Sequence, residues 1–204
     1  MAKEEKEHPI VAQYKTAYDI SEEYTSRLSA EILKKGFVGR KANKGTIDDV
    51  VKFLHSKDVA AMIKKALGGR VNDVSDEEIL TRYGLPKHVI QEELSQYESI
   101  TPDAILSLVQ RLSARIHGEM VSHHPAAIAN LAYDKGMDAA KAVVADLLKT
   151  SGGDKYAAAN QKTLDNIVTP DKLMDHTTDL YQRHLPAEMA RHSDRLRKAV
   201  YQSK

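Results

Sequence analysis

Two pairs of glutamate and histidine residues have the spacing that metal-binding chemistry would need. Glu119 precedes His123 by four residues, and Glu188 precedes His192 by four. Residues four apart share one face of an α-helix, so each pair could offer a carboxylate and an imidazole to a divalent ion. The spacing predicts a metal site at these four residues, and a metal-dependent helical enzyme as one alternative function. The other interpretation is a surface hydrogen bond within each pair.

A basic segment offers a second chemistry, the binding of phosphates or acidic proteins. Residues 31–71 contain ten Lys or Arg and four acids, whereas residues 72–99 contain two and seven. Cations and glycines lie close together at the start of the basic stretch, which predicts a flexible loop at residues 36–45 that could follow a nucleic-acid backbone. A solvated linker is the alternative interpretation. The candidate binding residues are Lys34, Lys35, Arg40, Lys41 and Lys44.

The segment SDEEILTRYGLPKHVIQEEL, residues 75–94, resembles the helix-turn-helix family of DNA-binding modules. Leu80, Gly84 and Ile90 occupy the packed position, the turn position and the second-helix position of that pattern. The resemblance implies a DNA-binding regulator as a further alternative function, with the second helix in the major groove. A helix corner that only packs is the other interpretation. The residues that would face DNA are Lys87, His88 and Gln91.

Helix-start signals recur along the chain, and the helices that they predict must position the candidate site residues. Thr-Pro-Asp occurs at residues 101–103 and again at 169–171, and each combines a capping hydroxyl, a proline and an acid at the first turn. Sliding the chain by the distance between them aligns further residues, which predicts a duplicated helical unit at about 75–123 and 143–192. The alternative is that unrelated helices begin with the same few capping residues. Other predicted caps are Thr46, Ser56 and Ser75.

The same signals predict an all-α fold, a helical bundle of about nine or ten helices that starts with a helix at residues 10–35. Two regions are expected: a basic helical region at 1–71 and a helical region with the repeat at 72–204. Cysteine is absent, which excludes disulfides, thiolate metal sites and cysteine nucleophiles. The charged start and the lack of a long apolar run predict a cytoplasmic protein that does not enter a membrane.

These features favour a non-catalytic helical binding or adaptor protein, or a subunit of a larger assembly. The expected partners are another protein or a second copy of the chain, with nucleic acid as the first class to test. No cofactor is expected, and a divalent metal ion belongs only to the enzyme alternative.

Overall fold

The computed structural model describes residues 6–202, and within them the chain folds into α-helices, as predicted. In this part of the chain the only extended pairing is a single antiparallel bridge between Lys41 and Ser99. None of the helices among these residues combines the length and the apolar character needed to cross a bilayer.

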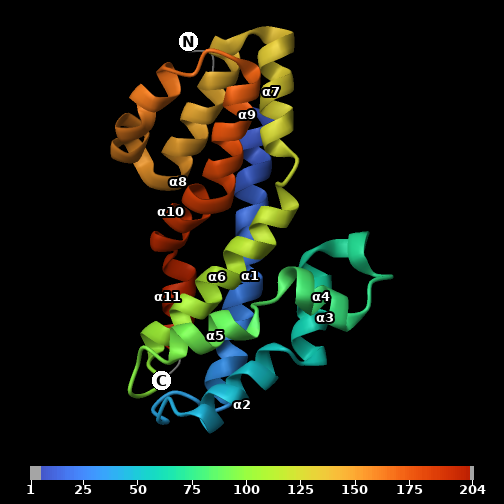
Figure 1. Ribbon diagram of the computed structural model, residues 1–204, viewed down its shortest axis with the longest axis vertical. Helices are drawn as coiled ribbons and strands as arrows, with labels where there is room; N and C mark the ends of the chain where they lie inside the picture. Colours follow the sequence, from blue (N-terminus) through green and yellow to red (C-terminus); the bar gives the residue numbers. More distant parts are fainter. Residues whose placement is uncertain (1–5, 203–204) are drawn as a thin grey trace. The chain divides into compact units, whose positions relative to one another are not determined.

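The chain divides into two compact units, each built from segments that are distant in the sequence (Figure 1). Unit 1 contains the beginning of α1 (Pro9–Lys34), α7 (His124–Lys135), α8 (Met137–Asp165), α9 (Pro170–Asp179), the π-helical turn η2 (Leu180–His184) and α10 (Leu185–Arg191). Unit 2 contains the rest of α1, α2 (Lys44–Leu54), α3 (Lys57–Ala66), the 3-10 turn η1 (Gly68–Val71), α4 (Asp76–Tyr83), α5 (Lys87–Leu94), α6 (Pro102–Met120) and α11 (Asp194–Tyr201). This grouping differs from the predicted division into 1–71 and 72–204, because α3 packs on α4 and α2 packs on α5.

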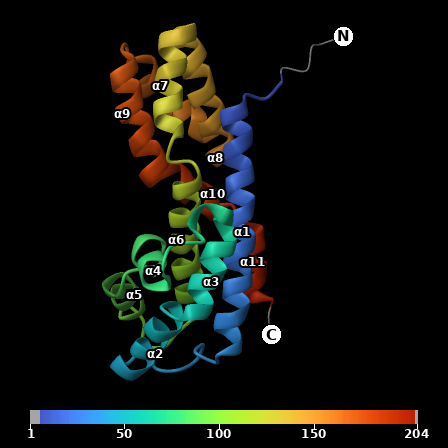
Figure 2. The ribbon, with the colours of Figure 1, turned by 90° about the vertical axis from the view of Figure 1, so that its right-hand side faces the viewer.

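Unit 1 is a group of helices around one apolar core. Helix α7 packs against both α8 and α9, and α10 packs against α8, so these helices lie side by side in Figures 1 and 2. The core takes residues from every helix of the unit and excludes water from a continuous apolar surface, which is the main source of its stability. Its fully buried members include Tyr14, Ile128, Val144, Leu147, Leu148, Leu164, Leu173 and Leu185.

Two irregular positions shape the helices of unit 1. Gly153 lies inside α8 with φ +80°, a left-handed conformation that glycine adopts without strain, and α8 is kinked there. At η2 the N–H of Leu185 donates to the carbonyl of Leu180, five residues earlier. Pro186 follows directly and has no N–H for the carbonyl of Gln182, so the regular α-helical ladder cannot continue through this turn.

A buried histidine joins three helices of unit 1. His124 is fully buried, and its Nδ1 lies 3.0 Å from the hydroxyl of Tyr181, while its Nε2 lies 2.9 Å from Oε1 of Gln13. A carboxamide oxygen only accepts, so Nε2–H donates to Gln13 and Nδ1 accepts from Tyr181. The Tyr181 ring also meets the Tyr14 ring edge-on, with 5.5 Å between centroids. Paired hydrogen bonds therefore make a buried polar side chain compatible with this core.

Unit 2 buries the apolar stripe of α1 against the shorter helices. Leu28 and Ile32 on α1 are fully buried, together with Ile63, Ile79, Ile90, Ile105 and Leu112 from the helices that follow. Figure 2 shows α3 beside α1, with α4 and α5 next to α3 and α2. Helix α11 completes the unit, because the hydroxyl of Ser193 at its start donates to the buried Glu22 carboxylate of α1.

Most predicted caps are confirmed. The side-chain oxygens of Ser56, Ser75, Thr101 and Thr169 accept from the N–H three residues on, at 3.1–3.4 Å. The cap of α2 is Asn43 rather than Thr46, because the Asn43 carboxamide accepts the N–H of Thr46 at 3.0 Å and Thr46 itself is buried. Asparagine and threonine are both favoured at the N-cap, so the sequence alone does not decide between Asn43 and Thr46.

Candidate functional site

The basic segment predicted as a flexible loop is a turn held in place by a distant strand-like segment. Gly39 N–H donates to the carbonyl of Ile100 at 2.8 Å, Ile100 N–H donates to that of Arg40 at 2.9 Å, and Ala42 N–H donates to that of Glu98 at 2.9 Å. Backbone pairing of this kind fixes both segments. The segment from Lys34 to Lys44 is called the basic turn below.

An aromatic contact anchors the basic turn from inside. Phe37 is buried and packs on Phe53 of α2, with 6.3 Å between ring centroids. Lys35 places its ammonium 5.4 Å from the Phe53 ring centroid, and the Arg40 guanidinium lies 5.8 Å from that of Phe37. Cations over aromatic faces are attracted by the ring quadrupole, so these two side chains are oriented as well as exposed.

Neighbouring acids neutralise part of the predicted basic patch. Lys34 pairs with Glu31 at 2.8 Å, which lowers the pKa of that carboxyl, and Arg40 pairs with Asp49 at 3.1 Å. Lys41 is exposed, as is Lys44. Within residues 6–202 neither of these two lysines has an ion-pair partner, and neither does Lys35, so these three are the exposed cations of the basic turn that no carboxylate pairs with.

The segment that resembles a helix-turn-helix forms two short helices joined by a tight connection. Ile90 of α5 is fully buried, Leu80 is half-buried, and Gly84 has φ −76° and ψ 173°, an extended conformation. Gly84 comes so close to the preceding helix that a Cβ there would lie 2.5 Å from the Leu80 carbonyl oxygen. The glycine is therefore required by its close approach to the last turn of α4 rather than by a left-handed turn.

The predicted DNA-facing residues of α5 lie together with an acid. Lys87 and His88 are exposed and Gln91 is half-buried, so the three can be reached from solvent. Glu92 is exposed one helical turn after His88, on the same face. The next acid, Glu93, is buried and pairs with Arg111 at 3.1 Å. DNA contact by α5 stays a prediction, and its face is electrostatically mixed.

The predicted metal ligands have separate partners. Glu188 pairs with Arg191 at 2.6 Å, and Glu119 accepts a hydrogen bond from the Tyr83 hydroxyl at 3.4 Å. His123 and His192 are exposed. Among the described residues no group of three or more His, Asp or Glu side chains is arranged to hold a metal ion, so the structure lends the metal prediction no support.

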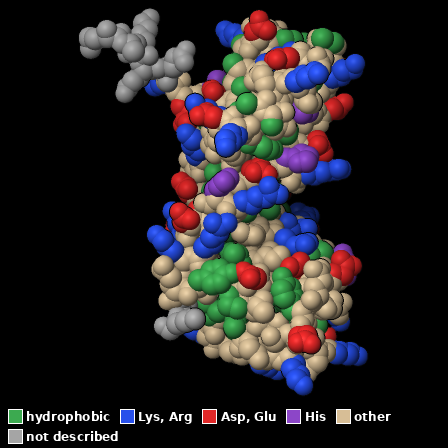
Figure 3. Space-filling view, turned by 90° about the vertical axis from the view of Figure 1, so that its left-hand side faces the viewer, with side chains coloured by type: hydrophobic (Ala, Val, Ile, Leu, Met, Phe, Trp, Pro, Cys, Tyr) green, Lys and Arg blue, Asp and Glu red, His purple; other side chains and the backbone are tan. Residues whose placement is uncertain are grey.

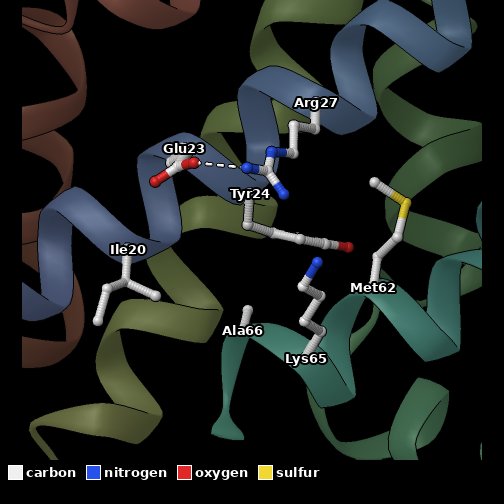
Figure 4. Close-up of a pocket in the computed structure, with 7 residues that line it drawn as sticks. All are labelled: Ile20, Glu23, Tyr24, Arg27, Met62, Lys65 and Ala66. Carbon is white, nitrogen blue, oxygen red and sulfur yellow. Dashed lines mark hydrogen bonds and ion pairs between the residues drawn. The ribbon is translucent and has the colours of Figure 1, made fainter.

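A groove between α1 and α3, not anticipated from the sequence, brings apolar and charged side chains together (Figure 4). It has a volume of about 370 Å³ and is lined by Ile20, Glu23, Tyr24, Arg27, Met62, Lys65 and Ala66. Tyr24 is only 6% exposed, and its hydroxyl has no hydrogen-bond partner among the described residues. Burial raises the pKa of this hydroxyl, which stays protonated and able to donate. These residues are called the Tyr24 groove below.

The Tyr24 groove combines an apolar wall with charged edges. Ile20 is 41% exposed, unusually open for a large aliphatic side chain in this structure. Arg27 pairs with Glu23 at 2.7 Å, whereas Lys65 has no ion-pair partner within residues 6–202. The sequence predicts a helix at residues 10–35, but nothing in its pattern links Tyr24 to a lysine forty-one residues later. Only the packing of α3 on α1 reveals the site.

Figure 3 shows Lys and Arg side chains intermixed with Asp and Glu on the face that it presents. No protein-family model, curated protein sequence or solved structure matches this chain.

Proposed function

We propose that this chain is a non-catalytic helical binding protein that receives an acidic partner on the basic turn, with nucleic acid as the partner class. The observation that carries the proposal is that Lys35, Lys41 and Lys44 are presented by a turn fixed through backbone hydrogen bonds to residues 98–100. A preformed surface loses less conformational freedom on binding than a mobile loop does.

The distribution of ion pairs supports the same surface. Lys41 and Lys44 have no ion-pair partner among the described residues, so a phosphate backbone could approach them without first displacing a carboxylate. Phosphate contacts of this kind give affinity without base specificity, and they release counterions. We therefore expect binding that depends steeply on salt and only weakly on DNA sequence.

Fluorescence anisotropy with a labelled duplex of about 20 base pairs, at ionic strengths of about 0.05 M and about 0.2 M, tests the proposal. The triple variant Lys35→Glu, Lys41→Glu, Lys44→Glu should lose binding at the lower salt. Single Lys→Gln variants should each lower the slope of log affinity against log salt by about 0.9 for every phosphate contact removed.

A matched variant controls for total charge. Lys155, Lys162 and Lys172 are exposed lysines of unit 1, and changing all three to Glu alters the net charge equally. This control should keep most of its affinity. Equal loss in both triple variants, or no binding at low salt, would refute the proposal. Loss of binding in Lys87→Ala with Gln91→Ala, and not in the basic-turn variant, would transfer the site to α5.

A further inference from the structure

The Tyr24 groove contains a buried hydrogen-bond donor that the protein itself does not use. A buried polar group without a partner costs free energy, so native structures pair nearly all of them. Tyr24 is more than nine-tenths buried, and its hydroxyl has no partner among the described residues. Figure 4 shows its side chain reaching across the groove, with Lys65 and Met62 of α3 beside the hydroxyl end. A ligand atom that accepts a hydrogen bond would remove this cost.

The charges around the groove favour a singly charged anion. Arg27 and Lys65 are its two cations, and Glu23 is the acid that lines it, which leaves a local charge of +1. Glu23 already forms an ion pair with Arg27, whereas Lys65 has no ion-pair partner in the described part of the chain and lies next to the unused hydroxyl donor. A carboxylate balances this charge, whereas a phosphate monoester carries nearly two negative charges and would also face the Glu23 carboxylate.

The remaining wall of the groove is apolar. Ile20, Met62 and Ala66 line it alongside the Tyr24 ring, and the groove volume of about 370 Å³ lies within the range of small-ligand sites, about 300–1,000 Å³. Met62 and Lys65 are long unbranched side chains that can change rotamer to admit a ligand. An aliphatic chain placed here would bury apolar surface and cover the exposed Ile20.

We propose that the Tyr24 groove is a binding site for a monocarboxylate that carries an aliphatic chain. The Tyr24 hydroxyl donates a hydrogen bond to one carboxylate oxygen, and the Lys65 ammonium pairs with the carboxylate. The chain lies along Ile20, Met62 and Ala66. This site shares no residue with the basic turn, so its test is separate from the test of the proposed nucleic-acid binding.

Titration of the ¹⁵N-labelled full chain with sodium octanoate, followed by amide chemical shifts, tests the site. The amides of Ile20, Met62 and Ala66 should shift in a saturable way. Tyr24→Phe removes the hydroxyl alone, and Lys65→Gln removes the charge alone. Each should weaken octanoate binding roughly tenfold, because each loses one hydrogen bond or ion pair to a charged group. Tyr133→Phe and Lys57→Gln, at exposed positions outside the groove, should bind octanoate as the unchanged protein does.

Two further ligands separate the parts of the proposal. Octanamide keeps the chain and removes the charge, so it should bind roughly tenfold more weakly than octanoate. The peptide acetyl-Ala-Ala-Leu with a free carboxylate tests whether the natural source is a peptide C-terminus. Tighter binding of the peptide would identify that source, and tighter binding of octanoate would identify a free acid. Absence of saturable shifts with both ligands would overturn the proposal. So would octanoate affinities of Tyr24→Phe and Lys65→Gln that both equal the affinity of the unchanged protein.

Discussion

Gly84 gives the sharpest test of how the chain leaves the end of α4. Its φ of −76° and ψ of 173° suit any residue, so replacement by alanine introduces no backbone strain. The added Cβ would lie 2.5 Å from the carbonyl oxygen of Leu80 and 3.2 Å from its carbonyl carbon and Cα. These are backbone atoms of a packed helix and cannot rotate away. We expect Gly84→Ala to lower the free energy of unfolding by about 1–3 kcal/mol, the usual cost of overpacking.

Urea unfolding followed by circular dichroism measures this change. With a loss of about 2 kcal/mol and a slope of about 2 kcal/mol per molar, the midpoint should fall by about 1 M urea. Gly118 provides the matched control, because it lies within α6 and a Cβ there meets nothing within 4 Å. Gly118→Ala should raise the free energy of unfolding by about 0.5–1 kcal/mol through helix propensity. Equal midpoints for the two variants would refute the close approach at Gly84.

Three further predictions follow from single side chains. Tyr24→Phe should raise the free energy of unfolding by about 1 kcal/mol, seen as a higher melting temperature, because it removes a buried hydroxyl without a partner. Ser193→Ala should lower the free energy of unfolding by about 1–3 kcal/mol and speed hydrogen exchange in α11, since it removes both the helix cap and the donor to Glu22. Burial lowers the pKa of His176, so the unfolded chain binds more protons below about pH 6.5 and stability should fall as the pH drops through that value. We expect the His176→Gln variant to lose the fall in stability that His176 causes below about pH 6.5. Thermal melting between about pH 7.5 and about pH 5 measures this.

Local signals predicted the helices well because caps act over three or four residues. Ser56, Ser75, Thr101 and Thr169 each accept the N–H that their position requires, and α1 begins and ends within one residue of the expected range. The division into units could not be predicted in the same way. It depends on which helices pack together, and that information lies in side chains far apart in the sequence.

The predicted duplication illustrates the same limit. Both segments contain a helix interruption near a glycine, Gly84 in one and Gly153 in the other, and both continue with a helix that begins after a capping threonine. Their burial differs: Ile90 and Leu94 are fully buried in α5, whereas the corresponding Ala158 and Lys162 are exposed. Shared caps fix where helices start, and only a shared core would require common packing. The duplication therefore stays a prediction that rests on shared helix-capping residues.

Charge illustrates why site chemistry needs the folded chain. Along the sequence, residues 31–71 carry an excess of six positive charges, which alone predicts a strongly basic surface. In the structure Lys34 forms an ion pair with Glu31, and Arg40 forms one with Asp49. Lys64 pairs with Asp76 from the acidic stretch that follows. Exposed pairs of this kind contribute little to stability, but they lower the field that an approaching anion meets. On the basic turn Lys35, Lys41 and Lys44, and in the Tyr24 groove Lys65, have no ion-pair partner within residues 6–202, so we expect these four cations to matter for binding at the two sites.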